Sequence, residues 1–468
     1  MSLQLMNFFY LIASVLFILG LKYMSHPRTA VRGNLLGALG MLIAIVVTLM
    51  DRNIVSYQVI VAGLVVGGLI GAIMAYRAPM TAMPQVVAVF NGFGGGASAL
   101  AVGAAFIEAL KGSFFEEINV LFTSSVAIAG FIGGIAFTGS GVAFAKLQGL
   151  MKERPIILPY RHLINIALAL ICVALSVMFV MNPASSSATY WIMLAVACVL
   201  GITLVIPIGG ADMPVVISLL NAYSGLAAAG HGWVLNNSVL IISGSLVGSA
   251  GFILTAIMCK AMNRSLTNVM FAGVGEIVAS EAESKDVYAG RVKATSPEEV
   301  AMLLEGARRV VIVPGYGLAV AQAQYAIQDL TNYLESKGVE VEFAIHPVAG
   351  RMPGHMNVLL AEANIPYDKL KEMDEINPTF RQTDVVIVIG ANDVVNPIAR
   401  NVTDPSNPIA GMPILNVDEA RSVVIVKRSL SPGFAGIANP LFAADNSLML
   451  FGDAKKMAVA LVAALKEA

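Results

Sequence analysis

The sequence predicts a membrane all-α part with about nine transmembrane helices, followed by a soluble α/β domain that contains a six-stranded parallel sheet. Apolar residues make up 57% of the 468 residues and the mean hydropathy is +0.77, whereas soluble domains average about 45–50% apolar. Residues 1–259 hold only 16 of the 59 charged side chains. Beyond residue 305, short β-rich runs alternate with helical patterns. We therefore divide the chain into a transmembrane domain (1–259), a connector (260–305) and a soluble domain (306–468).

Nine apolar stretches reach or approach the roughly 20 residues that a helix needs to cross a bilayer. They are 3–21, 35–50, 54–75, 84–110, 118–145, 160–181, 190–208, 213–230 and 238–259. The first is expected to be a retained membrane helix, because its first cation is Lys22 and it lacks the basic start of a signal peptide. Frequent glycines, as in 63–71 and 130–141, predict close packing between helices.

Cations near the ends of these stretches indicate the orientation in the membrane. Arg52 and Lys111 fall on one side, and nine cations fall in alternate connections on the other. The nine are Lys22, Arg28, Arg32, Arg77, Lys146, Lys152, Arg154, Lys260 and Arg264. The positive-inside rule places the side with nine in the cytoplasm. Because the number of spans is odd, the N-terminus is expected outside and the C-terminal domain inside.

The composition disfavours some classes of protein. The net charge of −1 leaves no basic surplus to pair with phosphates, so a nucleic-acid partner is disfavoured. Cys172, Cys198 and Cys259 all lie in apolar stretches, so neither a metal site nor a disulfide framework is expected.

Six β-rich runs are expected to form the sheet: 310–313, 340–345, 385–389, 413–417, 423–427 and 447–451. Strands that alternate with helices are typical of a parallel sheet covered on both faces, so a Rossmann-like domain is predicted. The connector contains Gly273–Gly275, an acidic run at 276–283, and a short helix expected to start at Ser296-Pro297-Glu298-Glu299, with Ser296 as N-cap.

A glycine turn follows the first predicted strand. Residues 310–313 run into Gly315-Tyr316-Gly317, and a helix is expected from there to about residue 337. This is the strand, turn and helix context of a dinucleotide fingerprint, in which Gly317 would let the backbone approach a pyrophosphate at the helix N-terminus. Val320 replaces the third glycine, so the pattern is also consistent with a plain turn.

Two strand ends bear on the choice of cofactor. The second strand ends at His346 without the carboxylate that an NAD site usually carries there. The fifth strand delivers Lys427, Arg428 and Ser429 at its carboxyl end, where two cations and a hydroxyl suit a phosphate monoester. A solvated basic pair is the alternative. Together the two features favour NADP over NAD. Glycine- and proline-rich loops at 348–353, 390–394 and 431–436 also follow strands and are expected to form a lid over one crevice.

Several motifs in order resemble the β-subunit family of proton-translocating NAD(P) transhydrogenase over nearly the full chain. In the soluble part they are Gly315–Leu318, His346–His355, Gly390–Asp393, Lys427–Ser429 and Leu450–Lys456; in the membrane part they are Phe137–Ser140, Asn221–Gly225 and Met258–Ser265.

The resemblance implies an oxidoreductase and translocase of the Re/Si-specific type that passes hydride directly between NADH and NADP⁺, driven by protons flowing inward. No catalytic acid–base residue and no metal are then required. It also implies that NADP(H) binds here in an orientation reversed relative to an ordinary Rossmann cofactor. The residues implied to bind it are Gly315, Tyr316, Gly317, Val348, Ala349, Gly350, Arg351, Met352, Pro353, Gly390, Ala391, Asn392, Asp393, Val394, Gly411, Met412, Lys427, Arg428, Ser429, Leu430, Ser431, Pro432, Gly433, Phe434, Asp453 and Ala454. Phe434 stands where many relatives have tyrosine.

The resemblance further implies that NAD(H) binds to a partner α subunit, made of one or two polypeptides, whose soluble domain docks on this one. A dimer of α–β units in the bacterial inner (cytoplasmic) membrane, in contact with lipid, is expected.

Polar side chains inside the apolar stretches are candidates for a proton pathway, because such groups are costly in a membrane. We select Asn91, Ser140, Asp212 and Asn221; a helix–helix hydrogen bond is the alternative for each, and more so for Glu108 and His231 near stretch ends. Many relatives carry histidine at position 91, and asparagine does not titrate. We hypothesise that a helix of the α subunit supplies the titrating imidazole beside Asn91, and that Asp212 couples protonation to the soluble domain.

Two other functions fit parts of the pattern. A transporter or channel gated by a nucleotide-sensing domain would bind NADP without consuming NADH. A haem-bearing reductase is disfavoured, because His26, His162 and His231 are not paired for axial ligation.

Overall fold

The computed structural model describes residues 3–24, 29–50, 57–112, 118–152, 155–183, 187–272, 288, 290–352, 354–401, 407, 409–433 and 435–467. The expected glycines 273–275, the acidic run 276–283, Pro353 and Phe434 lie outside them. The chain forms two compact units: Met1–Gly209 with Val216–Thr255, and Gly210–Val215 with Ala256–Ala468.

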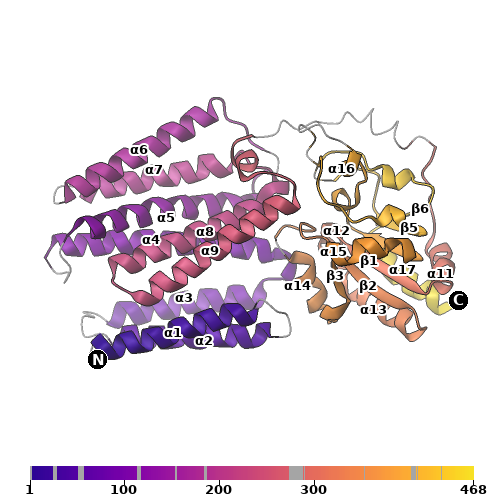
Figure 1. Cartoon of the computed structure of the whole chain (residues 1–468), viewed down its shortest axis with the longest axis horizontal. Coiled ribbons are helices and arrows are strands. Elements are labelled where there is room, and N and C mark those ends of the chain that lie inside the picture. The colour runs from indigo at the N-terminus through magenta and orange to yellow at the C-terminus, as the bar shows by residue number, and fades with distance from the viewer. Residues whose placement is uncertain are drawn as a thin grey trace. The chain divides into compact units, whose positions relative to one another are not determined.

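Nine helices in the described part of the chain are long and apolar enough to cross a membrane, which confirms the predicted number (Figure 1). They are α1 (Leu3–Met24), α2 (Ala30–Leu49), α3 (Tyr57–Arg77), α4 (Met83–Leu110), α5 (Val120–Leu147), α6 (Arg161–Met181), α7 (Ser187–Val205), α8 (Met213–Val234) and α9 (Ser238–Ala261). Short turns of helix precede α4 (η1, Met80–Ala82) and α8 (η3, Gly210–Asp212) and follow α9 (η4, Asn268–Ala272). The predicted ends differ from these by a few residues.

Glycines allow the helices of the membrane part to approach closely. A Cβ on Gly95 of α4 would lie 2.9 Å from the carbonyl oxygen of Gly133 on α5, and a Cβ on Gly225 of α8 would lie 2.4 Å from the backbone nitrogen of Gly248 on α9. Without a hydrophobic driving force between helices in lipid, such backbone contact is a main source of packing energy. The pattern at 130–141 therefore serves helix packing, since a Cβ on Gly130, Gly133 or Gly134 would lie within 3 Å of another helix. The prediction for 63–71 is wrong, because a Cβ on any glycine of that segment of α3 would meet nothing within 4 Å among the described residues.

The soluble part contains a six-stranded sheet in which all neighbouring strands are parallel, in the order β3-β2-β1-β4-β5-β6. The strands are β1 (Arg309–Pro314), β2 (Glu340–Ile345), β3 (Leu370–Glu372), β4 (Val385–Ile389), β5 (Ser422–Lys427) and β6 (Ser447–Phe451). Their Val/Ile runs are buried because helices cover both faces. This order is that of a dinucleotide-binding sheet, and the predicted fold class is confirmed.

One predicted strand is wrong. Residues 413–416 form no regular element, and Val417–Glu419 form the helical turn η8. The sixth strand is instead β3, which extends β2 at the edge of the sheet through Leu370, Lys371 and Glu372. A three-residue edge strand with two charged side chains lacks the apolar run on which the prediction relied.

Helices connect the strands. They are α11 (Pro297–Glu305), α12 (Tyr316–Val320), α13 (Gln324–Ser336), α14 (His355–Glu362), α15 (Met373–Ile376), α16 (Ile398–Asn401) and α17 (Ala454–Glu467), with the turns η5 (Tyr367–Lys369), η6 (Asn377–Gln382), η7 (Asp393–Val395) and η9 (Pro440–Ala443). The expected start of α11 is confirmed, since Ser296 and Glu299 form a capping box. The single helix expected from the glycine turn to about residue 337 is split into α12 and α13, where Gln322 has a positive φ of 49°.

Candidate functional site

The loops after β1 and β4 meet backbone to backbone. The N–H of Gly315 donates to the carbonyl of Ile389 and the N–H of Gly317 donates to the carbonyl of Gly390, both at 2.9 Å. A Cβ on Gly390, whose φ is +70°, would lie 2.2 Å from the nitrogen of Leu318. The strand order reverses between β1 and β4, so the chain segments that follow these two strands lead away from each other. A ligand crevice is therefore expected between them, at the carboxyl ends of the strands. The glycines are required for the contact between the two loops, and the approach of Gly317 to a pyrophosphate stays a prediction.

Two buried histidines shape the loop after β2. The N–H of Val348 donates to Nδ1 of His346 at 3.2 Å, and the N–H of Arg351 donates to Nδ1 of His355 at 3.1 Å. Both side chains are about 1% exposed, and burial lowers the pKa of each to about 4. Each imidazole is therefore neutral at physiological pH and accepts at Nδ1. Nε2 of His346 then donates to the carbonyl of Pro413 at 2.8 Å.

The same loop reaches the loop after β1. The guanidinium of Arg351 lies over the ring of Tyr316, 4.4 Å from its centroid, and the ring of His355 lies 6.2 Å from the Tyr316 ring. Gly350 has a φ of +125°, and a Cβ there would lie 2.7 Å from the His355 ring. The predicted residues Val348–Met352 and Tyr316 thus lie together, and Ala349 among them is buried.

The loop after β5 covers the loop after β4. Oδ2 of Asp393 accepts from the N–H of Ala435 at 3.0 Å, and a Cβ on Gly433 would lie 2.5 Å from Oδ1 of Asp393. With the Asn392 amide oxygen turned toward donors, it accepts from Nζ of Lys427 at 3.1 Å and from the N–H of Gly433 at 2.6 Å. These contacts hold the loop 431–436 closely against the loop after β4, and both loops belong to the predicted lid.

Lys427 and its neighbours form a cationic end to β5. Nζ of Lys427 donates to the carbonyl of Ser431 and lies 4.8 Å from the ring centroid of Phe442. Burial lowers the pKa of Lys427 to about 8, against the opposing effect of the Asp393 carboxylate. Arg428 and Ser429 are exposed, as are the predicted lid residues Ser431 and Pro432, whereas Leu430 and Gly433 are half-buried. This segment presents positive charge and a hydroxyl at the surface.

The remaining predicted residues of the soluble part occupy two places. Asp453 caps α17, since its Oδ1 accepts from the N–H groups of Lys455 and Lys456 at 3.2 and 3.3 Å. Ala454 is the first residue of that helix, and the N–H of Gly452 donates to the carbonyl of Lys427 at 3.0 Å. Both residues therefore lie beside the cationic segment. Side-chain and backbone contacts together link these loops, from the loop after β2 to the start of α17, into one edge.

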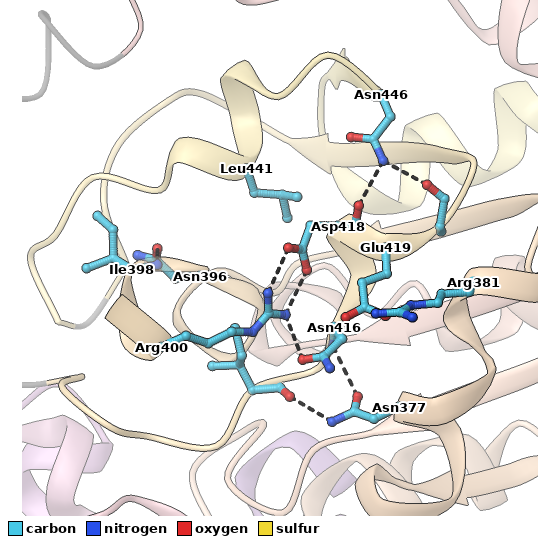
Figure 2. A network of polar contacts seen from close by, with 12 residues as sticks. Asn377, Arg381, Asn396, Ile398, Arg400, Asn416, Asp418, Glu419, Leu441 and Asn446 are labelled. Carbon is cyan, nitrogen blue, oxygen red and sulfur yellow. Dashed lines mark hydrogen bonds and ion pairs between the residues drawn. The ribbon is translucent and has the colours of Figure 1, made fainter. Parts of the chain in front are cut away.

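Gly411 and Met412 stand apart from that edge and line a cavity of about 500 Å³. Its wall also includes Met373, Asp374, Asn377, Ala399, Arg400, Pro413, Ile414 and Asn416. Figure 2 shows why the wall is fixed: Arg400 binds both oxygens of Asp418 at 2.8 Å and Oδ1 of Asn416 at 2.6 Å. The link to the edge runs through Val394, whose carbonyl accepts from the N–H of Leu415 at 3.0 Å, and through His346.

Three of the four predicted proton-pathway residues lie on helices of the membrane part. Nδ2 of Asn91 on α4 donates to the carbonyl of Ile217 on α8 at 3.2 Å. Ser140 on α5 faces α4, since a Cβ on Gly92 would lie 3.2 Å from its Cβ, and its buried Oγ has no hydrogen-bond partner among the described residues. Asn221 lies one turn beyond Ile217 on α8 and is half-buried.

The fourth predicted residue, Asp212, directly precedes α8. It belongs to the compact unit that also contains Ala256–Ala468. Its two carboxylate oxygens accept from one nitrogen of Arg264 at 2.9 and 2.8 Å, and both side chains are largely buried. The structure therefore gives Asp212 an ion-pair partner, Arg264, which the sequence placed in the cation count and in the motif Met258–Ser265 but did not pair with Asp212.

A family model described as NAD(P) transhydrogenase beta subunit matches residues 6–464. An NAD(P) transhydrogenase subunit beta from Rhodospirillum rubrum is 48% identical over 460 residues, which cover 97% of this chain and 98% of that protein. A second relative, from a designated strain of the same organism, gives the same values. The chain belongs to the NAD(P) transhydrogenase beta subunit family. The family name makes the chain part of an oxidoreductase that uses nicotinamide nucleotides, and implies an alpha subunit partner. With nine membrane-competent helices in the part of the chain that the structure describes, the protein is a multi-pass membrane protein.

The edge of the sheet fits a nicotinamide nucleotide of this transhydrogenase family. Such a nucleotide carries phosphates, and the exposed Arg428, Ser429 and Ser431 are donors that suit phosphate oxygens. Gly433 leaves no room for a side chain beside Asp393, which keeps the backbone of the lid close to this edge. The donor set and the close backbone therefore suit a phosphorylated ligand.

Sequence reasoning missed the roles of two residues that support this site and of one residue in the membrane part. His346 and His355 accept from the backbone of the loop after β2, and a histidine at each end of that motif was the available signal. Lys146 at the end of α5 entered only a charge count, yet it is fully buried and donates to the carbonyls of Ile206 and Ile208 at 2.6 and 2.7 Å. A lone lysine within an apolar helix was the signal for this role.

Proposed function

We propose that this chain binds NADP(H) in residues 306–468 and, with an α subunit that holds NAD(H), couples hydride transfer between NADH and NADP⁺ to inward proton translocation through residues 1–259. Residues 260–305 would connect the two. The observation that carries the proposal is the cationic segment Lys427–Ser429 at the carboxyl end of β5, next to the glycine contact of β1 and β4 in a sheet of dinucleotide-binding order.

NADP(H) rather than NAD(H) is supported by the charges at the two relevant strand ends. The ammonium of Lys427 and the guanidinium of Arg428 would bind the 2′-phosphate, and the hydroxyl of Ser429 would donate to it. The end of β2 offers His346, buried and neutral, in place of a carboxylate for ribose hydroxyls. The reversed nucleotide orientation is supported by Gly315 and Gly317, because the N–H groups that an ordinary Rossmann turn would offer to a pyrophosphate already donate to the loop after β4.

The protein's contribution to hydride transfer would be positioning and exclusion of water. Bound NADP(H) supplies the nicotinamide carbon that accepts or releases the hydride, so this chain needs no acid–base residue. The loops at Val348–Pro353 and Gly390–Val394, with Tyr316, would orient the nucleotide. The lid at Leu430–Phe434, with Gly411–Met412 and Asp453–Ala454, would complete its surroundings.

Protons would pass by Asn91, Ser140 and Asn221 and reach Asp212 at the cytoplasmic side. The unpartnered Oγ of Ser140 supports this route, because a buried hydroxyl without a described partner suits a water or a transient proton carrier. Asn91 does not titrate, so we assign the titrating imidazole to a helix of the α subunit beside it. The pair of Asp212 with Arg264 would couple protonation to the nucleotide domain.

The assembly would be a dimer of α–β units in the bacterial inner membrane, acting as a Re/Si-specific transhydrogenase. A cytoplasmic C-terminal domain is supported by the nine cations on one side of the membrane part against two on the other.

The test uses the chain co-expressed with its α subunit and reconstituted in vesicles. NADH should reduce an NADP⁺ analogue, and a pH-sensitive dye should report proton movement linked to that reduction. Lys427→Ala and Arg428→Ala should raise the KM for NADP⁺ at least tenfold, a loss of about 1.4 kcal/mol, while the exposed Lys337→Ala should not.

Asp212→Asn and Asn221→Leu should separate the two activities, by reducing proton movement more than hydride transfer. Full proton pumping in both variants would contradict the proposed route. NADP binding without any reduction by NADH would instead favour a transporter or channel that senses the nucleotide.

A further inference from the structure

Tyr288 belongs to the connector in sequence but to the core of the nucleotide domain in space. Its side chain is 8% exposed and packs in the same cluster as β4 and β5 residues. Its ring stacks on that of Phe442, with centroids 6.2 Å apart and an interplanar angle of 16°. None of the sequence motifs includes it. Its location is of interest because two sets of contacts lead from it to Lys427.

The first set is aromatic. Phe442 has Tyr288 stacked on its ring, and Nζ of Lys427 lies 4.8 Å from the centroid of the same ring. An ammonium this close to an aromatic ring is attracted by the ring quadrupole and is partly removed from water. The position of Phe442 therefore determines both where the ammonium lies and how strongly it is desolvated, and Tyr288 fixes the position of Phe442.

The second set is a chain of hydrogen bonds. The hydroxyl oxygen of Tyr288 accepts from the N–H of Asn439 at 2.8 Å. Asn439 is fully buried, and its Nδ2 donates to the carbonyl of Asn392 at 3.1 Å. The Asn392 amide oxygen in turn accepts from Nζ of Lys427 at 3.1 Å and from the N–H of Gly433 in the lid. Hydrogen-bonded chains of this kind hold their members in one geometry.

We propose that Tyr288 is a positioning residue for the phosphate-binding lysine: by fixing Phe442 and Asn439 together, it sets the location and the hydration of the Lys427 ammonium. This inference rests on the proposed function of Lys427 as a ligand of the 2′-phosphate. It also gives the connector an influence on nucleotide affinity, because Tyr288 lies ahead of α11 in the sequence and is linked to Lys427 through Phe442 and Asn439.

If Tyr288 only filled space in the core, its replacement would have different effects. A residue that only fills space would change thermal stability without changing how Lys427 titrates. Burial lowers the pKa of Lys427, and the Asp393 carboxylate on the loop after β4 is the charged group that opposes this effect. The Phe442 ring is one of the groups that lie against the ammonium. If Tyr288 no longer holds Phe442, Lys427 gains water and its pKa rises toward its ordinary value of 10.5.

The test measures displacement of bound NADPH from the assembled α–β enzyme by 2′-AMP, which carries the phosphate monoester, between pH 7 and 10. Tyr288→Leu should weaken 2′-AMP about tenfold at pH 7 and move the pH midpoint of its binding upward by about one unit. Tyr288→Phe keeps the stacked ring and loses only the acceptor for Asn439, so it should weaken 2′-AMP about threefold at an unchanged midpoint. Tyr367→Phe, at an exposed tyrosine, is the matched control.

Phe442→Leu covers the case in which Tyr288→Leu does not assemble, and it should move the midpoint in the same direction. Wild-type affinity and midpoint in an assembled Tyr288→Leu or Phe442→Leu enzyme would overturn the inference while leaving the role of Lys427 intact. Unchanged 2′-AMP binding in Lys427→Ala would overturn the proposed function, and this inference with it.

Discussion

Raising the pH from 7 to 9 is expected to weaken NADP(H) binding about tenfold, because Lys427 loses its charge in that range. The pKa of Lys427 is lowered to about 8, chiefly by burial. The protonated fraction then falls from about nine-tenths at pH 7 to about one-tenth at pH 9. Of the two forms of Lys427, only the ammonium attracts the phosphate, whose second ionisation, near pH 6, is about nine-tenths complete at pH 7 and changes little above it. Above the free-protein pKa, the apparent Kd should therefore rise with pH.

The measurement is titration of the α–β enzyme with NADPH, followed by its fluorescence, at half-unit steps of pH. Lys427→Arg is the matched variant, since a guanidinium stays charged throughout and should give a flat profile. His346 and His355 do not contribute to the slope, because burial holds their pKa values near 4. A flat wild-type profile, or one that begins to rise only near pH 10, would refute the assignment of a buried Lys427 to the phosphate.

Three other changes test the supporting structure. Gly390→Ala should destabilise the nucleotide domain by at least about 1–2 kcal/mol, because φ of Gly390 is +70° and the new Cβ would lie 2.2 Å from a backbone atom. A lower thermal midpoint of unfolding would show this. Gly306→Ala is the control and should change the midpoint little, since the nearest atom to its Cβ would be 3.9 Å away. His355→Leu leaves the N–H of Arg351 without its acceptor, at a cost of about 1–3 kcal/mol, and should weaken NADP(H) binding. His355→Asn offers an amide oxygen in place of Nδ1 and should retain most of the binding affinity. Equal losses of affinity in the two variants would contradict the role of Nδ1. Lys146→Met removes the donor to two backbone carbonyls and should lower the thermal midpoint of the membrane part in detergent, and Lys146→Arg should restore part of it.

The candidate site was predictable where its chemistry lies next to a strand end in the sequence. Lys427 follows a run of Val and Ile, and Gly315 follows another, so their place at the carboxyl edge of a parallel sheet follows from local pattern alone. The partners of these residues were not predictable. Gly317 donates to Gly390, 73 residues further along the chain, and no local pattern pairs the two.

The one wrong strand shows the same limit. Residues 413–417 have the apolar composition of a strand, but their backbone has no neighbour in the sheet. The polar Leu370–Glu372 segment becomes β3 because β2 offers it a free edge. Strand formation at an edge depends on available hydrogen-bond partners more than on side-chain propensity.

The sequence by itself determined what depends on local composition: nine apolar helices, a parallel α/β domain, and a cationic strand end. These follow because apolar length and side-chain periodicity act over a few residues. Only the tertiary structure decided which groups share an environment. The hydroxyl of Tyr288 and the N–H of Asn439 belong to residues 151 positions apart, and three successive hydrogen bonds lead from that hydroxyl to Lys427. Burial, pKa and hydrogen bonding are set by such neighbours in space, and no short stretch of sequence contains them.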